Sequence, residues 1–108
     1  KGGGIRLLDV GCGSGAVLGA LARDPQLVGQ VSQLTAVDFS ADMVRVAQQN
    51  YDQLRHEGAG GQLEARIQEM DGQSLGFAAH SFDAAIAMFS VMFFPDRAAG
   101  LRGMCRVL

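Results

Sequence analysis

Short apolar runs alternate with longer stretches of mixed polarity along this chain. Residues 5–10 form a mainly apolar run, which predicts a strand buried on both faces. Runs at 34–37 and 63–70 predict two further strands. The most apolar segment, 82–89, predicts a central fourth strand.

The stretches between these runs carry helical patterns. Apolar side chains after residue 15 begin a helix that Asp24 and Pro25 stop. Residues 41–56 place apolar side chains at three- and four-residue spacing behind Ser40, a residue suited to cap a helix. Residues 95–107 predict a last helix, and 26–31 fit either a helical turn or a loop.

This alternation of strands and helices predicts an α/β fold. We expect a Rossmann-like, doubly wound and mostly parallel sheet with strand order 3-2-1-4 and helices on both faces. The crossover at 71–81 is expected to be partly irregular. Ligands in such sheets bind outside the carboxyl ends of the strands, where Asp9, Asp38 and Asp71 fall.

The first predicted strand ends in a loop that is poor in side chains. Gly11, Gly13 and Gly15 alternate with the small residues Cys12 and Ser14. Such a loop turns tightly and lets a ligand approach the main chain. Because a helix follows, we expect the loop to present free N–H groups at the helix N-terminus.

Asp9 distinguishes between the ligands that such a loop can bind. A dinucleotide-binding loop follows G-x-G-x-x-G and binds a pyrophosphate, which a carboxylate would repel. Here the third glycine comes one residue early and Asp9 ends the strand, an arrangement that suits a ligand with a positively charged end.

With D-V-G-C-G-S-G the chain resembles the class I S-adenosylmethionine-dependent methyltransferases, whose D-x-G-x-G-x-G loop holds the methionine end of the cofactor. The resemblance implies S-adenosylmethionine as cofactor and methyl transfer by in-line displacement to a small-molecule acceptor. Two alternatives stay open. One is an NAD-dependent oxidoreductase, and the other is a non-catalytic methyltransferase-like binding module. The loop residues implied to bind the cofactor are Asp9, Gly11, Cys12, Gly13 and Gly15.

Asp38 follows the second predicted strand, 23 residues after Gly15. A carboxylate there can accept hydrogen bonds from both ribose hydroxyls of an adenosine. The alternative is an acid that caps the helix before Ser40. On the ribose assignment, we expect Asp38 to be unpaired when no cofactor is bound.

The resemblance also implies an adenine site after the third strand. Asp71 would accept from the adenine amino group, and the Gly72 N–H would meet a ring nitrogen. A simple turn acid is the alternative for Asp71. Phe39 and Met43 would cover the adenine face, although Met43 also fits an ordinary core position.

Two further residues, Met88 and Phe89, are expected beside the reactive end of the cofactor. Asp83 is expected to be structural. Many relatives have histidines a few positions farther on, where Met92 and Phe93 stand here, so no histidine base is predicted. The apolar residues in this stretch favour a hydrophobic acceptor site or plain core packing, and they are Phe89, Val91, Met92, Phe93 and Phe94.

Composition narrows the remaining choices. The chain has 108 residues and a net charge of −2, with nine Lys and Arg against eleven acids, so no nucleic-acid partner is expected. No apolar run approaches a membrane span, and the two cysteines predict neither a metal site nor a disulfide. We therefore expect a cytoplasmic protein.

The resemblance covers nearly the whole chain and ends before the family's fifth strand. We therefore expect residues 1–108 to be the S-adenosylmethionine-binding core of a methyltransferase domain that lacks its C-terminal strands. The fourth strand would then be an exposed apolar sheet edge, through which copies of the chain could self-associate.

Overall fold

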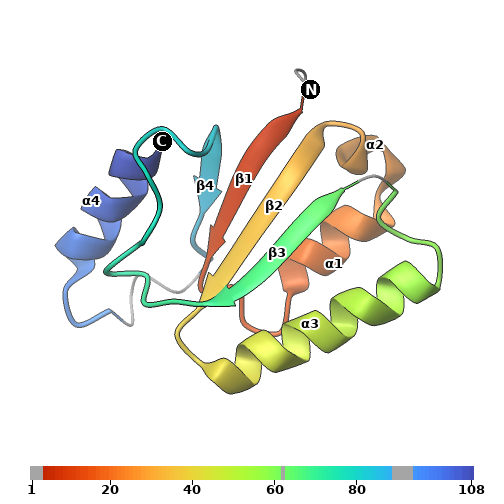
Figure 1. Ribbon diagram of the computed structural model, residues 1–108, viewed down its shortest axis with the longest axis horizontal. Helices are drawn as coiled ribbons and strands as arrows, with labels where there is room; N and C mark the ends of the chain where they lie inside the picture. Colours follow the sequence, from red (N-terminus) through yellow and green to blue (C-terminus); the bar gives the residue numbers. More distant parts are fainter. Residues whose placement is uncertain (1–3, 62, 89–93) are drawn as a thin grey trace.

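The structure, a computed structural model, describes residues 4–61, 63–88 and 94–108. These residues form a four-stranded parallel sheet in the order β3-β2-β1-β4, with helices on both faces (Figure 1). The predicted α/β fold and strand order 3-2-1-4 are confirmed. In chain order the elements are β1 (Ile5–Val10), α1 (Ala16–Arg23), α2 (Pro25–Val28), β2 (Val31–Asp38), α3 (Ala41–His56), β3 (Glu64–Glu69), β4 (Ala84–Ile86) and α4 (Arg97–Val107).

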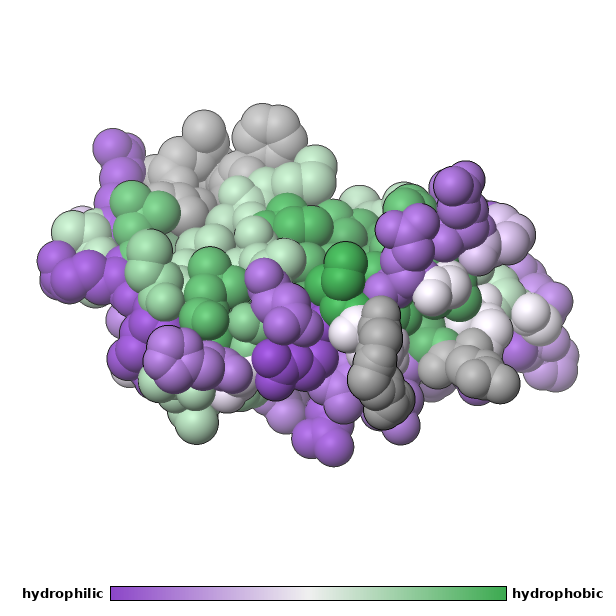
Figure 2. Space-filling model, turned by 90° about the horizontal axis from the view of Figure 1, so that it is seen from above, coloured by the Kyte–Doolittle hydropathy of each residue, from purple (hydrophilic) through white to green (hydrophobic). Residues whose placement is uncertain are grey.

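Each face of the sheet has its own hydrophobic core because successive side chains of β1 point to opposite faces. Leu7 packs with Leu18 and Leu21 of α1, while Leu8 packs with Val107 of α4. Figure 1 shows α1 and α3 on one side of the sheet and α4 on the other. Figure 2, seen from the end where the strands begin, shows hydrophobic side chains gathered between hydrophilic ends.

The second strand is longer than predicted. β2 begins at Val31, where it pairs with Ile5 of β1, rather than at residue 34. Ser32 and Gln33 are polar, so the hydrophobic pattern did not predict a strand at residues 31–33. β1 and β3 nevertheless supply backbone hydrogen-bond partners to this stretch. Residues 25–28 form the short helix α2, which settles the open choice for 26–31 in favour of a helical turn.

The fourth strand lies at the predicted edge of the sheet but is shorter than predicted. β4 covers only Ala84–Ile86 and lies at the edge of the described sheet, with half-buried side chains. Phe82 is buried, but its N–H bonds the Val107 carbonyl at the end of α4. Phe82 therefore packs in the hydrophobic core but does not belong to β4. Residue 89, the predicted strand end, lies outside the described residues.

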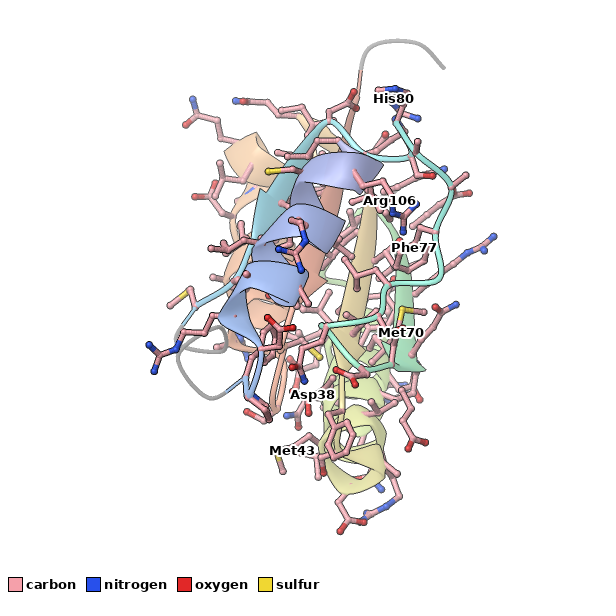
Figure 3. The ribbon with its side chains drawn as sticks, turned by 90° about the vertical axis from the view of Figure 1, so that its left-hand side faces the viewer. Asp38, Met43, Met70, Phe77, His80 and Arg106 are labelled. Atoms are coloured by element: carbon pink, nitrogen blue, oxygen red, sulfur yellow. The ribbon has the colours of Figure 1, made fainter. Side chains whose placement is uncertain are left out.

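The crossover between β3 and β4 is irregular, as predicted, and α4 holds it in place. Arg106 of α4 donates to the carbonyl oxygens of Phe77 (2.7 Å) and Leu75 (2.8 Å). The rings of Phe77 and Phe82 meet edge to face at 5.0 Å. Figure 3 shows Arg106 beside Phe77, midway along the path from Met70 to His80.

Asp83 has the structural role predicted for it. Its carboxylate accepts hydrogen bonds from the Arg6 backbone N–H (2.9 Å) and from the Arg6 guanidinium (3.1 Å). Those bonds hold the pKa of Asp83 down at about 2. This ion pair joins the start of β4 to β1 on the exposed surface.

Candidate functional site

The glycine loop between β1 and α1 adopts a conformation that favours glycine. Gly11, Gly13 and Gly15 have φ values of 76°, 56° and 96°. A Cβ atom at Gly13 would meet no atom within 4 Å, so this part of the loop is open to a ligand. At Gly15 it would lie 3.5 Å from the Ala47 Cβ of α3, so this part of the loop packs against a helix.

The prediction that the loop presents free N–H groups is wrong for most of its residues. Gly11 and Cys12 both donate to the Val37 carbonyl, at 2.8 and 2.9 Å. Gly15 donates to the Cys12 carbonyl at 3.0 Å, and Gly13 donates to a carboxylate of β2. These internal bonds stabilise the loop without any ligand and occupy the N–H groups of Gly11, Cys12, Gly13 and Gly15.

That carboxylate belongs to Asp38. The prediction that Asp38 is unpaired without a cofactor is wrong. Its Oδ2 accepts from the Gly13 N–H at 2.8 Å, and its Oδ1 accepts from the Ser40 N–H at 2.9 Å. The acid thus ties the end of β2 both to the glycine loop and to the turn before α3. An ionised carboxylate has about four acceptor positions, so each oxygen keeps room for a second donor.

Asp9 is buried in the sheet below the loop. Its side chain is 2% exposed, and its Oδ2 has no hydrogen-bond partner among the described residues. Burial, with a smaller contribution from the negative charge of Asp38, raises the pKa of Asp9 to about 6. The carboxylate is therefore largely ionised at neutral pH, in a place where its charge is poorly solvated.

A turn built on Asp71 and Gly72 follows β3. Asp71 Oδ1 accepts from the Gln73 backbone N–H at 2.9 Å, the arrangement of a turn acid. Gly72 is buried, and a Cβ atom there would approach Val10 Cγ1 to 2.8 Å and the Phe94 ring to 2.5 Å. The turn therefore fits tightly between the end of β1 and the segment that leads into α4.

A cleft of about 640 Å³ brings these strand ends together. Its volume is in the range of small-molecule and cofactor sites. Six of the predicted site residues line it: Gly11, Asp38, Phe39, Asp71, Gly72 and Met88.

The predicted cofactor-binding residues did not include five others that line the same cleft, although Phe94 was expected in an apolar acceptor site. Val10 ends β1 and Met70 directly follows β3, so the rule that ligands bind at carboxyl ends could have identified them. Gln73, Phe94 and Pro95 carry no such signal, because only the packing of α4 brings residues 94 and 95 against the Asp71 turn.

The other predicted site residues lie near the cleft or outside the description. Asp9 and Cys12 are buried behind it, and Gly13 and Gly15 lie in the loop beside it. Met43 is in the first turn of α3, at the same end of the molecule as Asp38 (Figure 3). Phe89 lies outside the described residues.

Apolar side chains at the mouth of the cleft are unusually exposed. Phe39 is 77% exposed and Met88 is 53% exposed, although both line the cleft. Large apolar side chains grouped at a concave site are typical of a surface that a ligand covers.

The cleft contains little acid–base chemistry of its own. Burial, followed by the nearby Asp9 and Asp38 charges, raises the pKa of the Cys12 thiol to about 12, so this thiol stays neutral. His56 ends α3, and His80 lies at the opposite end of the sheet from Asp38 (Figure 3). Within residues 4–61, 63–88 and 94–108, no cluster of side chains could hold a metal ion.

The amino-acid sequence of this chain was compared with protein families and with curated proteins. Residues 8–108 match a family model described as a methyltransferase domain. The aklanonic acid methyltransferase DauC of Streptomyces sp. (strain C5) is 30% identical over 105 residues, which are 97% of this chain and 44% of that protein. A ubiquinone biosynthesis O-methyltransferase of Xanthomonas axonopodis pv. citri is 33% identical over 105 residues, 97% of this chain and 39% of that protein.

Solved structures share the fold as well. The YcgJ protein of Bacillus subtilis superposes with a TM-score of 0.78 at 27% identity, covering 98% of this chain and 40% of that one. The chain thus spans about two fifths of the length of the curated relatives it matches. None of the described helices is both long and apolar enough to cross a membrane.

Proposed function

This chain belongs to the methyltransferase domain family, and from that premise we propose that it binds S-adenosylmethionine and transfers its methyl group to a small-molecule acceptor. The observation that carries the proposal is the cleft lined by Asp38 and Asp71, with the glycine loop beside it and Asp9 buried behind it. These acids come from three neighbouring parallel strand ends.

The residues present fit a cofactor with a cationic end. Asp9 carries a buried oxygen without a partner among the described residues, and a positive charge nearby would stabilise its ionised form. A dinucleotide fits less well, because the charge of the buried Asp9 carboxylate would repel its pyrophosphate. This arrangement favours S-adenosylmethionine over NAD.

Each part of the cofactor would have its own residues. The glycine loop from Gly11 to Gly15 and the charge of Asp9 would hold the methionine end, and Asp38 would accept from the ribose hydroxyls. Asp71 and Gly72 would hold the adenine edge. Phe39 and Met43 would cover the adenine ring, and Met88 would lie toward the sulfur.

When bound, the cofactor supplies a methyl group already activated by the adjacent sulfonium. The chain's share is then to align the two reactants and to exclude water. Apolar side chains at the mouth of the cleft, among them Phe39, Met88 and Phe94, serve that exclusion. No histidine among the described residues lines the cleft, which suits an acceptor that needs no strong protein base.

A small molecule is the acceptor class that the relatives support. DauC is named for aklanonic acid, and the Xanthomonas enzyme for ubiquinone biosynthesis. The exposed apolar side chains around this cleft are compatible with a hydrophobic acceptor of that kind. We propose residues 1–108 as the cofactor-binding core.

Calorimetry with three ligands tests the proposal. S-adenosylmethionine and S-adenosylhomocysteine should both bind, and NAD should not. Mass spectrometry should then detect a methylated product when a hydroxylated quinone is added together with S-adenosylmethionine. Binding of NAD alone would refute the proposal and favour an oxidoreductase. Cofactor binding with no transfer to any acceptor would favour a non-catalytic binding module.

A further inference from the structure

Gln73 lies in the cleft and joins two parts of it that are distant in sequence. Its side-chain Nε2 donates to Asp71 Oδ1 at 3.3 Å. Its Oε1 accepts from the backbone N–H of Asp96 at 2.8 Å. Asp96 in turn caps α4, because its carboxylate accepts from the Ala99 N–H at 3.0 Å.

The orientation of the Gln73 amide follows from the partners themselves. A backbone N–H can only donate, so the group that faces Asp96 must be the amide oxygen. The amide nitrogen then faces Asp71, where an ionised carboxylate can only accept. Rotating the amide by 180° would lose both hydrogen bonds, and the side chain therefore has one favourable arrangement.

This arrangement orients the Asp71 carboxylate. The backbone N–H and the side-chain Nε2 of Gln73 both donate to the same oxygen, Oδ1, at 2.9 and 3.3 Å. Both bonds leave the second oxygen, Oδ2, uninvolved, and it belongs to a residue that lines the cleft. Gln73 thus leaves one carboxylate oxygen as the acceptor for a ligand.

Apolar packing also holds the Asp71 turn against the start of α4. Cβ atoms placed on Gly72 and Gly100 would each approach the Phe94 ring to 2.5 Å, so the ring sits in a notch between the two glycines. The Asp71 turn and the start of α4 are therefore held together by a hydrogen bond and by this ring. A change at Gln73 alone leaves the apolar half of the link intact.

We propose that Gln73 is a positioning residue that presents Asp71 Oδ2 to the 6-amino group of the cofactor's purine and so selects adenine over a 6-oxo purine. The inference rests on the proposed function, because it assumes that the cleft binds an adenosine cofactor. A 6-amino group donates to a carboxylate, whereas a 6-oxo group presents a second acceptor and is repelled. Selection therefore depends on where the second carboxylate oxygen is held.

The test compares two probes, S-adenosylhomocysteine and S-inosylhomocysteine, by calorimetry on the purified protein. The wild type should prefer the adenine compound by about 10- to 100-fold, the range for one hydrogen bond to a charged group. Gln73→Leu removes both side-chain hydrogen bonds and should reduce this preference about 5- to 10-fold. Gln73→Glu keeps an oxygen for the Asp96 N–H but places a carboxylate where the donor to Asp71 stood. Because the two like charges repel, this variant should reduce the preference by at least a similar factor and should lower the unfolding midpoint without preventing folding.

Gln48→Leu provides the matched control. Gln48 also donates to an aspartate, Asp52, at 2.9 Å, but on the exposed face of α3. This variant should leave both affinities unchanged.

The outcomes separate the inference from the proposed function. Wild-type preference for the adenine compound, with the same preference in both Gln73 variants, would overturn the role of Gln73 and leave the proposed function standing. Failure of the wild type to bind S-adenosylhomocysteine would overturn both. Loss of folding in Gln73→Glu as well as Gln73→Leu would show a structural role instead and would also overturn the inference.

Discussion

Replacing Asp9 by asparagine should make the protein more stable above neutral pH while weakening its cofactor site. The substitution keeps the shape of the side chain and removes the charge of a residue that is only 2% exposed. Burial raises the pKa of the Asp9 carboxyl from 3.8 to about 6, because ionisation without solvent is unfavourable.

The direction and size of the effect follow from proton linkage. The folded state holds the Asp9 proton more tightly than the unfolded state, so folding stability falls as pH rises from about 4 through about 6. At about 1.4 kcal/mol for each unit of pKa difference, the loss between pH 4 and pH 8 is about 2–3 kcal/mol. An asparagine side chain cannot ionise, and the Asp9→Asn variant therefore should not suffer this loss.

Urea unfolding of both proteins at several pH values measures the difference. The free energy of unfolding of Asp9→Asn, relative to wild type, should rise by about 2–3 kcal/mol from pH 4 to pH 8. Comparing the same pair at two pH values cancels the constant effect of a buried neutral amide. If the free energies of unfolding of the two proteins changed with pH in parallel, the reasoning would be refuted. Such a result would show that folding does not raise the pKa of Asp9.

Cofactor affinity should change in the opposite direction. A carboxylate that lacks a buried partner gains one when a cationic ligand binds nearby, an effect of about 1 or more pKa units. We therefore expect Asp9→Asn to bind S-adenosylmethionine at least about tenfold more weakly at pH 8. Asp52→Asn, on the exposed face of α3, is the matched control and should change neither stability nor affinity.

Three further predictions concern the loop and the sheet edge. Asp38→Ala removes the acceptor for the Gly13 and Ser40 N–H groups, so the free energy of unfolding in urea should fall by about 1–3 kcal/mol. Calorimetry should show that S-adenosylhomocysteine binds about 30- to 1000-fold more weakly, and unchanged stability would contradict the structural role of Asp38. Asn50→Ala frees the Ser14 carbonyl, to which Asn50 donates at 2.9 Å, and should weaken the same binding about 2- to 5-fold without moving the unfolding midpoint; wild-type affinity would show that α3 does not position the loop. The β4 edge should cause concentration-dependent self-association in light scattering, and a monomer at every concentration would argue against it.

Much of the fold could be predicted from local pattern alone. The helix 41–56 and its Ser40 cap were predicted with the observed bounds, because apolar spacing and capping chemistry are properties of neighbouring residues. The strand order 3-2-1-4 followed from the alternation of strands and helices, since parallel strands need crossover connections. The three acids at the strand ends were found for the same reason.

The errors arose where partners distant in sequence decide the outcome. β2 begins three residues earlier than predicted, because β1 and β3 supply hydrogen bonds to polar residues there. β4 begins at Ala84 rather than at residue 82, and the Phe82 N–H bonds the end of α4 rather than β1. An apolar sequence shows that a segment is buried, but the segment's neighbours determine whether its backbone pairs in the sheet.

The site divides in the same way. The sequence by itself determined which residue types stand at the strand ends and that the glycine loop is free of bulky side chains. Only the tertiary structure decided that Asp38 holds the loop through the Gly13 N–H and that Gln73 links Asp71 to the start of α4. Hydrogen bonds and ionisation depend on distance and burial in three dimensions. Asp38 and Gly13 are 25 positions apart in the sequence, and they form their hydrogen bond only when the chain has folded.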